Sequence, residues 1–140
     1  MKITIKNLQT KLPVHPARIK KIILNILKDE KVKESGWINV CFVDDTLIKK
    51  YNAKFHKTKG STDVLAFNLS DKKNKKKILL ADIMISTDTA IKQAKSFKTT
   101  ADYELSLYVA HGILHILGYN DHTENQKKLM RKKESRYVDR

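Results

Sequence analysis

The sequence predicts a single α/β (α+β) domain over residues 1–140, in which a small mixed sheet of about four strands packs against about five helices. Segments with the alternation typical of strands are interleaved with segments of helical periodicity. One helical segment, residues 101–117, is apolar around most of its circumference, which places it at the centre of the fold. The 140 residues, 41% of them hydrophobic, suffice for one core, and no repeat or long linker divides them.

The N-terminal third predicts a strand, a helix and a second strand. Alternating apolar and polar residues predict a strand over residues 2–8. Pro16 suits the first turn of a helix, which apolar residues at helical spacing continue to near Lys33. Gly36 interrupts this pattern, and the β-branched and aromatic residues of 37–43 predict the second strand.

The middle of the chain predicts a helix followed by a hairpin. Asp44 or Asp45 can cap a short helix. The segments that follow are a loop at 57–61, a strand at 64–67, a lysine-rich hairpin tip at 71–77 and a strand at 78–85.

Three helices complete the chain. Ser86 or Thr87 can cap a helix over residues 88–97. The central helix that follows begins with a Thr99-x-x-Asp102 pattern resembling a capping box, and Gly118 suits its C-terminal cap. A basic helix runs from about residue 124 to 137.

The net charge points to a polyanionic partner. Lys and Arg number 29 against 15 Asp and Glu, which gives a formal charge of +14. Such a surface attracts nucleic acid through counterion release, although a lysine-rich surface can also serve solubility alone. Cys41 is the single cysteine, so an internal disulfide or a cysteine-rich zinc module is excluded. With no signal-peptide core and no apolar stretch of membrane-spanning length, we expect a cytoplasmic protein with no membrane partner.

The segment that carries chemistry lies at the end of the central helix. His111 and His115 are four residues apart and therefore share one helix face. The turn predicted at Gly118 brings Asp121 or His122 back beside that face, and both residue types bind zinc. Three protein ligands with an open position are typical of a catalytic zinc site. The alternative is a pair of ordinary histidines, but two of them interrupt a buried helix, where each needs a metal or a polar partner.

The third ligand is left open by spacing alone, since Asp121 and His122 both follow the turn. Zinc proteases of the His-Glu-x-x-His type carry their general base directly after the first histidine. Here that position is Gly112, which has no side chain. This argues against a metalloprotease, which is one alternative function.

The same segment resembles the hallmark of the YbeY family of bacterial endoribonucleases, His-Gly-x-Leu-His-x-x-Gly-Tyr-Asp-His. The positions that match are His111, Gly112, Leu114, His115, Gly118 and Tyr119. Residues 62–67 are similar to the family's Thr-Asp/Asn-Val-Leu-Ser-Phe strand, and residues 81–83 resemble its Gly-Asp-Ile strand. The motifs occur in the expected order, so the resemblance covers essentially the whole chain.

The resemblance implies a zinc-dependent, single-strand-specific endoribonuclease that matures the 3′ end of 16S ribosomal RNA and takes part in ribosome quality control. It also implies one zinc ion per chain, with His111 and His115 as metal-binding and catalytic residues. The implied partners are ribosomal RNA and ribosomal subunits, together with ribosomal proteins or an assembly GTPase. A further alternative is an RNA-binding assembly factor whose zinc is purely structural.

The sequence departs from the family pattern at two places that matter. In strict register the family's third histidine falls on Asp121, with His122 one residue later, so register favours Asp121 as the third ligand. An arginine that the family carries before its Thr-Asp-Val strand aligns with His56. The resemblance therefore implies that His56, with Lys57 and Lys59 beside it, steadies the substrate phosphate.

The last helix offers a second group of cations. Lys128, Arg131 and Lys132 can track an RNA backbone, and the alternative is a solvated helix face.

Overall fold

The protein is described here by a computed structural model, which places residues 1–55, 62–70 and 78–138. The strands are β1 (Lys2–Asn7), β2 (Ser35–Val43), β3 (Val64–Asn68) and β4 (Ile78–Ser86). The helices are α1 (Pro16–Asp29), α2 (Asp45–Phe55), α3 (Thr87–Phe97), α4 (Ala101–Ile116) and α5 (Glu124–Val138). The structure confirms the predicted α/β domain, in which a mixed sheet of four strands packs with five helices.

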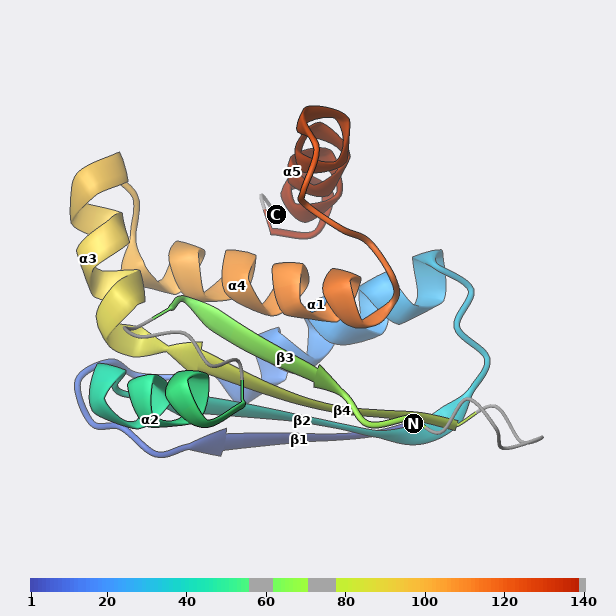
Figure 1. The fold of residues 1–140 in the computed structure, drawn as a ribbon, viewed down its shortest axis with the longest axis horizontal. Coiled ribbons are helices and arrows are strands. Elements are labelled where there is room, and N and C mark those ends of the chain that lie inside the picture. The colour runs from blue at the N-terminus through green and yellow to red at the C-terminus, as the bar shows by residue number, and fades with distance from the viewer. Residues whose placement is uncertain (56–61, 71–77, 139–140) are drawn as a thin grey trace.

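The four strands form one sheet in the order β1-β2-β4-β3. β1, β2 and β4 are parallel, whereas β3 runs antiparallel to β4 at the edge. Helices α1 and α4 lie over one face of this sheet, and α5 lies on the far side of α4 (Figure 1). The small helix α2 packs on the opposite face, where Ile48 meets Val43 and Leu65.

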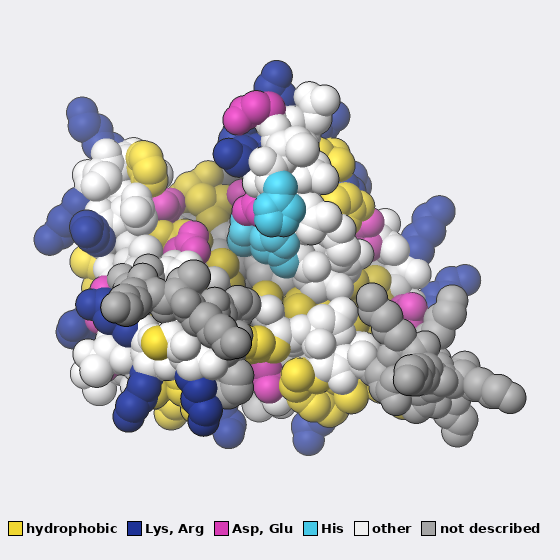
Figure 2. Space-filling model, in the orientation of Figure 1, with side chains coloured by type: hydrophobic (Ala, Val, Ile, Leu, Met, Phe, Trp, Pro, Cys, Tyr) yellow, Lys and Arg dark blue, Asp and Glu magenta, His cyan; other side chains and the backbone are white. Residues whose placement is uncertain are grey.

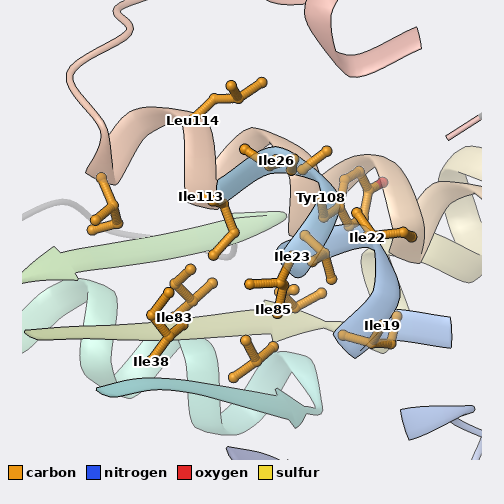
Figure 3. Close-up of a cluster of buried hydrophobic side chains, with 14 of the residues drawn as sticks. Ile19, Ile22, Ile23, Ile26, Ile38, Ile83, Ile85, Tyr108, Ile113 and Leu114 are labelled. Carbon is orange, nitrogen blue, oxygen red and sulfur yellow. The ribbon is translucent and has the colours of Figure 1, made fainter. Parts of the chain in front are cut away.

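The main core lies between the sheet and the helices α1 and α4. Isoleucines of α1 and β4 meet Ile113 and Leu114 of α4 there (Figure 3). Ile23, Ile26, Ile85 and Ile113 are fully buried, and burying such a side chain contributes about 1.5–3 kcal/mol. α4 contacts both neighbouring helices and the sheet, so the prediction that this apolar helix is central is confirmed.

The structure shows that two predicted helix ends were wrong. Thr100, and not Thr99, caps α4, because the Thr100 hydroxyl accepts the Tyr103 N–H, at 3.1 Å. The capping-box prediction was therefore wrong by one residue, and the Thr99 hydroxyl donates instead to the buried Glu104. α1 ends at Asp29 rather than near Lys33, because Lys31 adopts a left-handed conformation (φ 56°) that terminates the helix without a glycine to signal it.

Other predicted ends are confirmed. The Asp44 carboxylate accepts the Leu47 N–H at the start of α2, and the Ser86 hydroxyl accepts the Thr89 N–H at the start of α3. Gly118 has φ +105° and follows Leu117, the C-cap residue of α4. Its N–H donates to the His115 carbonyl while the Tyr119 N–H donates to the Leu114 carbonyl, which is the Schellman arrangement that reverses the chain.

Within the described ranges, no helix combines the length and the apolar character needed to cross a membrane. The predicted loop at 57–61 and the predicted hairpin tip at 71–77 both lie outside the described residues.

Candidate metal centre

The candidate metal centre lies where α4 ends. His111 and His115 occupy successive turns of α4, and their rings meet edge to face with centroids 4.5 Å apart. The turn at Gly118 returns the chain so that Asp121 Oδ2 lies 3.5 Å from His111 Nε2 and 3.6 Å from His115 Nε2. One ligand atom from each of the three residues falls within 4.8 Å of the others.

These separations fit ligands of one ion better than a direct hydrogen bond. A hydrogen bond to a ring nitrogen brings the heavy atoms to about 2.7–3.2 Å. Two ligands of a tetrahedral zinc, each bonded at about 2.0–2.1 Å, lie about 3.4 Å apart. The three side chains are 22% to 37% exposed, so solvent reaches the group. The residues therefore fit a metal ion that keeps one open coordination position.

His122 does not join this group in the structure. Its side chain is exposed, and its backbone N–H donates to Gln126 Oε1, at 3.0 Å, as part of the approach to α5. Among the described residues, His111, His115 and Asp121 are the only group with metal-ligand spacing.

The sequence motifs did not indicate Glu134, which binds the His111 ring at the nitrogen opposite the one that faces Asp121. Glu134 Oε1 lies 2.6 Å from His111 Nδ1, a hydrogen bond that leaves Nε2 directed at Asp121. A carboxylate behind a metal-binding histidine fixes the ring and its tautomer. The available signal was periodicity, because Glu134 follows the buried Met130 by four residues and precedes the buried Tyr137 by three. Glu134 is thus an acidic residue on the inner face of a basic helix.

The electrostatics of the centre favour a cation. Burial of the His111 ring disfavours its charged form, but the hydrogen bond and charge of Glu134, with Asp63 and Asp121 nearby, outweigh that effect and raise the pKa of His111. The negative charge of carboxylates that favours the protonated His111 ring also favours a metal ion bound beside that ring.

A second set of contacts holds the loop that carries Asp121. The Tyr119 hydroxyl donates to the Glu30 carboxylate at 2.8 Å, and Lys133 Nζ donates to the same carboxylate at 2.6 Å. Lys133 Nζ also lies 4.7 Å from the centroid of the Tyr119 ring. Glu30 follows α1 and Lys133 belongs to α5, so this clamp of Glu30, Tyr119 and Lys133 ties three helices together beside the centre.

Gly112 faces the sheet at close range. A Cβ at this position would lie 3.1 Å from Ile83 Cγ2 and 3.3 Å from Val64 Cγ2. The missing side chain therefore lets α4 approach β3 and β4, which sets the height of both histidines above the sheet.

The remaining predicted site residues lie elsewhere. His56, Lys57 and Lys59 are outside the described residues. Lys128, Arg131 and Lys132 are exposed on α5, and none of them takes part in an ion pair with another described residue. Figure 2 shows histidine side chains gathered at a hollow between α3 and α5, with acidic side chains on both sides of it.

A four-stranded mixed sheet packs against a central helix that carries two histidines, and the loop after this helix adds a carboxylate beside them. This arrangement defines a small α/β domain with a candidate metal site. Residues 4–140 match the model of one family, described as endoribonuclease YbeY. The chain belongs to this family, as the sequence resemblance predicted.

Full-length relatives and one solved structure agree with this assignment. The endoribonuclease YbeY of Desulforamulus reducens is 32% identical, with 100% of this chain and 97% of the relative covered. That of Caldicellulosiruptor saccharolyticus is 36% identical over 96% of this chain and 93% of the relative. The solution structure of TM1509 from Thermotoga maritima superimposes with a TM-score of 0.64 at 26% identity, covering 98% of this chain and 87% of the other.

Proposed function

We propose that this protein is a zinc-dependent, single-strand-specific endoribonuclease that acts in the cytoplasm on the 3′ end of 16S ribosomal RNA and in ribosome quality control. Family membership supports the endoribonuclease role. The observation that carries the metal dependence is the placement of Asp121 Oδ2 at 3.5 and 3.6 Å from the two histidine Nε2 atoms.

His111, His115 and Asp121 would hold one zinc ion per chain. When bound, zinc supplies a Lewis acid that polarises a phosphoryl oxygen and lowers the pKa of water. Glu134 keeps the His111 ring oriented through the bond to Nδ1, and the clamp of Glu30, Tyr119 and Lys133 holds the Asp121 loop. His56, Lys57 and Lys59 are proposed to steady the scissile phosphate.

The exposed cations of α5 are proposed to guide the RNA backbone toward this centre. Three of these side chains can bind phosphates, because they are exposed and form no ion pair with another described residue. They are Lys128, Arg131 and Lys132. The proposed partners of this protein are ribosomal RNA and ribosomal subunits, together with ribosomal proteins or an assembly GTPase.

The experiment compares cleavage of one RNA sequence as a single strand and as a duplex, with the metal removed by a chelator and zinc then restored. His111→Ala and His115→Ala should each lose zinc and cleavage, because three ligands hold the ion. His15→Ala is the matched control, since His15 is exposed and makes no side-chain cap to α1. Full cleavage by both centre variants would refute the metal mechanism. Metal binding without cleavage of any RNA would favour an assembly factor with structural zinc.

A further inference from the structure

A polar cavity lies along α4 on the N-terminal side of the candidate metal centre. It has a volume of about 510 Å³ and lies between α3, α4 and the start of β3. Its lining includes Asp63, Lys92, Gln93, Phe97, Glu104 and Tyr108. Figure 2 shows the surface hollowed between α3 and α5 on the face that carries the histidines.

The cavity and the centre follow one another along one face of α4. Glu104, Tyr108, His111 and His115 are spaced by four, three and four residues, so they form a single polar stripe. From Glu104 to His111 the helix rises by about 10 Å, at about 1.5 Å per residue. Asp63, which directly precedes β3, lines the cavity together with Glu104 and Tyr108.

Tyr108 is the feature that indicates a ligand. Its side chain is 7% exposed, and within the described part of the chain its buried hydroxyl has no hydrogen-bond partner. A buried hydroxyl without a partner loses its hydrogen bonds to water and gains none in return, so native folds rarely leave one unpaired. Burial, with the charges of Glu104 and Asp63, raises the pKa of Tyr108, so the hydroxyl keeps its proton and can donate it.

Glu104 supplies the complementary acceptor. It is 4% exposed, and only its Oε2 is engaged by a described residue, the Thr99 hydroxyl at 3.2 Å. Asp45, another carboxylate of the cavity, is already occupied, because its Oδ1 accepts from Ser86 at 2.6 Å and from Thr89 at 3.2 Å. Among the described residues of the cavity, the buried polar groups left for a ligand are therefore the Glu104 carboxylate as an acceptor and the Tyr108 hydroxyl as a donor.

This combination fits a nucleobase rather than a phosphate or a second metal. Among the described residues that line the cavity, three carboxylates oppose the single cation Lys92, which disfavours a phosphate here. The described carboxylates of this cavity form no group with metal-ligand spacing. A carboxylate accepts from two adjacent N–H groups and a hydroxyl donates to a carbonyl, and guanine offers that donor–donor–acceptor edge. Phe97, with 66% of its surface exposed, provides a ring at the rim on which a base can stack.

We propose that this cavity is a base-binding subsite that selects a guanine next to the scissile phosphate, with Glu104 and Tyr108 reading the base edge. The proposal rests on the endoribonuclease function and adds a sequence preference to it. Single-stranded RNA is the substrate class that this arrangement requires, because the base edge must be unpaired to reach Glu104.

The first test titrates the zinc-loaded protein with guanosine 5′-monophosphate and adenosine 5′-monophosphate and follows binding by NMR. The phosphate is common to both probes, so their difference reports the base alone. We expect about tenfold tighter binding of the guanosine nucleotide, the equivalent of one charge-assisted hydrogen bond of about 1.4 kcal/mol. Tyr108→Phe should reduce guanosine binding about three- to tenfold and leave adenosine binding unchanged, and Glu104→Gln should abolish the preference.

Tyr137→Phe is the matched control, because Tyr137 is as buried (8% exposed) but belongs to α5 outside the cavity. Thermal unfolding checks that each variant is folded. Tyr108→Phe removes an unpaired hydroxyl and should not lower the melting temperature. Equal affinities of the folded wild type for the two nucleotides would overturn the proposal. It would also be overturned if Tyr108→Phe bound each nucleotide with the same affinity as Tyr137→Phe.

A second test measures cleavage of single-stranded RNAs that differ in the base beside the cleaved bond. A guanine preference that Glu104→Gln removes supports the subsite. Cleavage without any base preference overturns the subsite and leaves the endoribonuclease proposal standing. Absence of all RNA cleavage refutes the endoribonuclease proposal, and the nucleotide titration then still decides whether the cavity binds guanine.

Discussion

At the scale of single residues, the candidate metal centre depends on the orientation of three side chains. Helix geometry aligns His111 with His115, and Asp121 reaches them only because the chain reverses at Gly118. Glu134 then fixes the orientation of the His111 ring. Each of these contributions can be removed separately.

We expect Asp121→Ala to lower zinc affinity and RNA cleavage more than His122→Ala does. The Asp121 carboxylate lies between both histidines, whereas the exposed His122 lies outside the group. Losing one of three ligands should weaken zinc binding severely. Chelator competition and cleavage assays on the two variants in parallel measure the difference. If only His122→Ala lost metal, the loop would have to rearrange on binding, and the ligand assignment would be wrong.

Glu134→Gln tests the support behind His111. The variant keeps the size and a hydrogen-bond acceptor but loses the charge, so we expect zinc affinity to fall about 10- to 100-fold in a folded protein. Competition with a zinc chelator gives the affinity. Glu124→Gln on the same helix is the control, because the Glu124 side chain is 80% exposed. Equal affinities for the two variants would show that Glu134 does not support the metal.

At the scale of elements, the clamp around Glu30 joins the end of α1, the turn after α4, and α5. Burial tends to raise the pKa of Glu30, but the hydrogen bonds from Lys133 and Tyr119 and the charge of Lys133 lower it overall. A carboxyl whose pKa is lower in the folded protein stabilises the fold only while it is ionised. This stabilisation is complete above the usual glutamate pKa of about 4.5 and disappears as the pH falls through the lower, folded value.

We therefore expect Glu30→Gln to lower the free energy of unfolding by about 1–3 kcal/mol at neutral pH. The gap between variant and wild type should shrink as the pH falls from about 4.5 through the lower, folded pKa of Glu30. Urea unfolding followed across the acid range measures both free energies. A gap that is independent of pH would mean that ionised Glu30 is not what joins the three helices.

At the scale of the whole molecule, the charge of +14 governs encounter with RNA. We expect binding to single-stranded RNA to weaken as salt rises, with a logarithmic slope of about −0.7 for each phosphate neutralised. Reversing the charges of Lys128, Arg131 and Lys132 together should reduce the magnitude of that slope by about 2 if all three meet phosphates. Fluorescence anisotropy over a range of salt concentrations gives the slope.

The control reverses Lys2, Lys49 and Lys50, exposed residues of β1 and α2. Both triple variants carry the same net charge, so a general electrostatic attraction would change the two slopes alike. An equal effect would show that α5 is only a solvated surface.

Much of the fold follows from local periodicity in the sequence. The alternation of residues 2–8, the apolar run of α4 and the cap at Gly118 each depend on neighbours within a few positions, and each appears in the structure. The pairing of His111 with His115 follows in the same way, since helix geometry alone places them on one face. Family membership was also readable from the motif around these residues.

Tertiary packing decided the rest of the site. The approach of Asp121, with His122 left outside, depends on how the loop after α4 is held by Glu30 and Lys133. Glu134 reaches His111 across 23 positions of sequence, and β3 takes an antiparallel edge position beside β4. Such contacts join segments whose residues show no mutual periodicity. Their partners are selected by the free energy of packing whole helices onto the sheet, which no local pattern encodes.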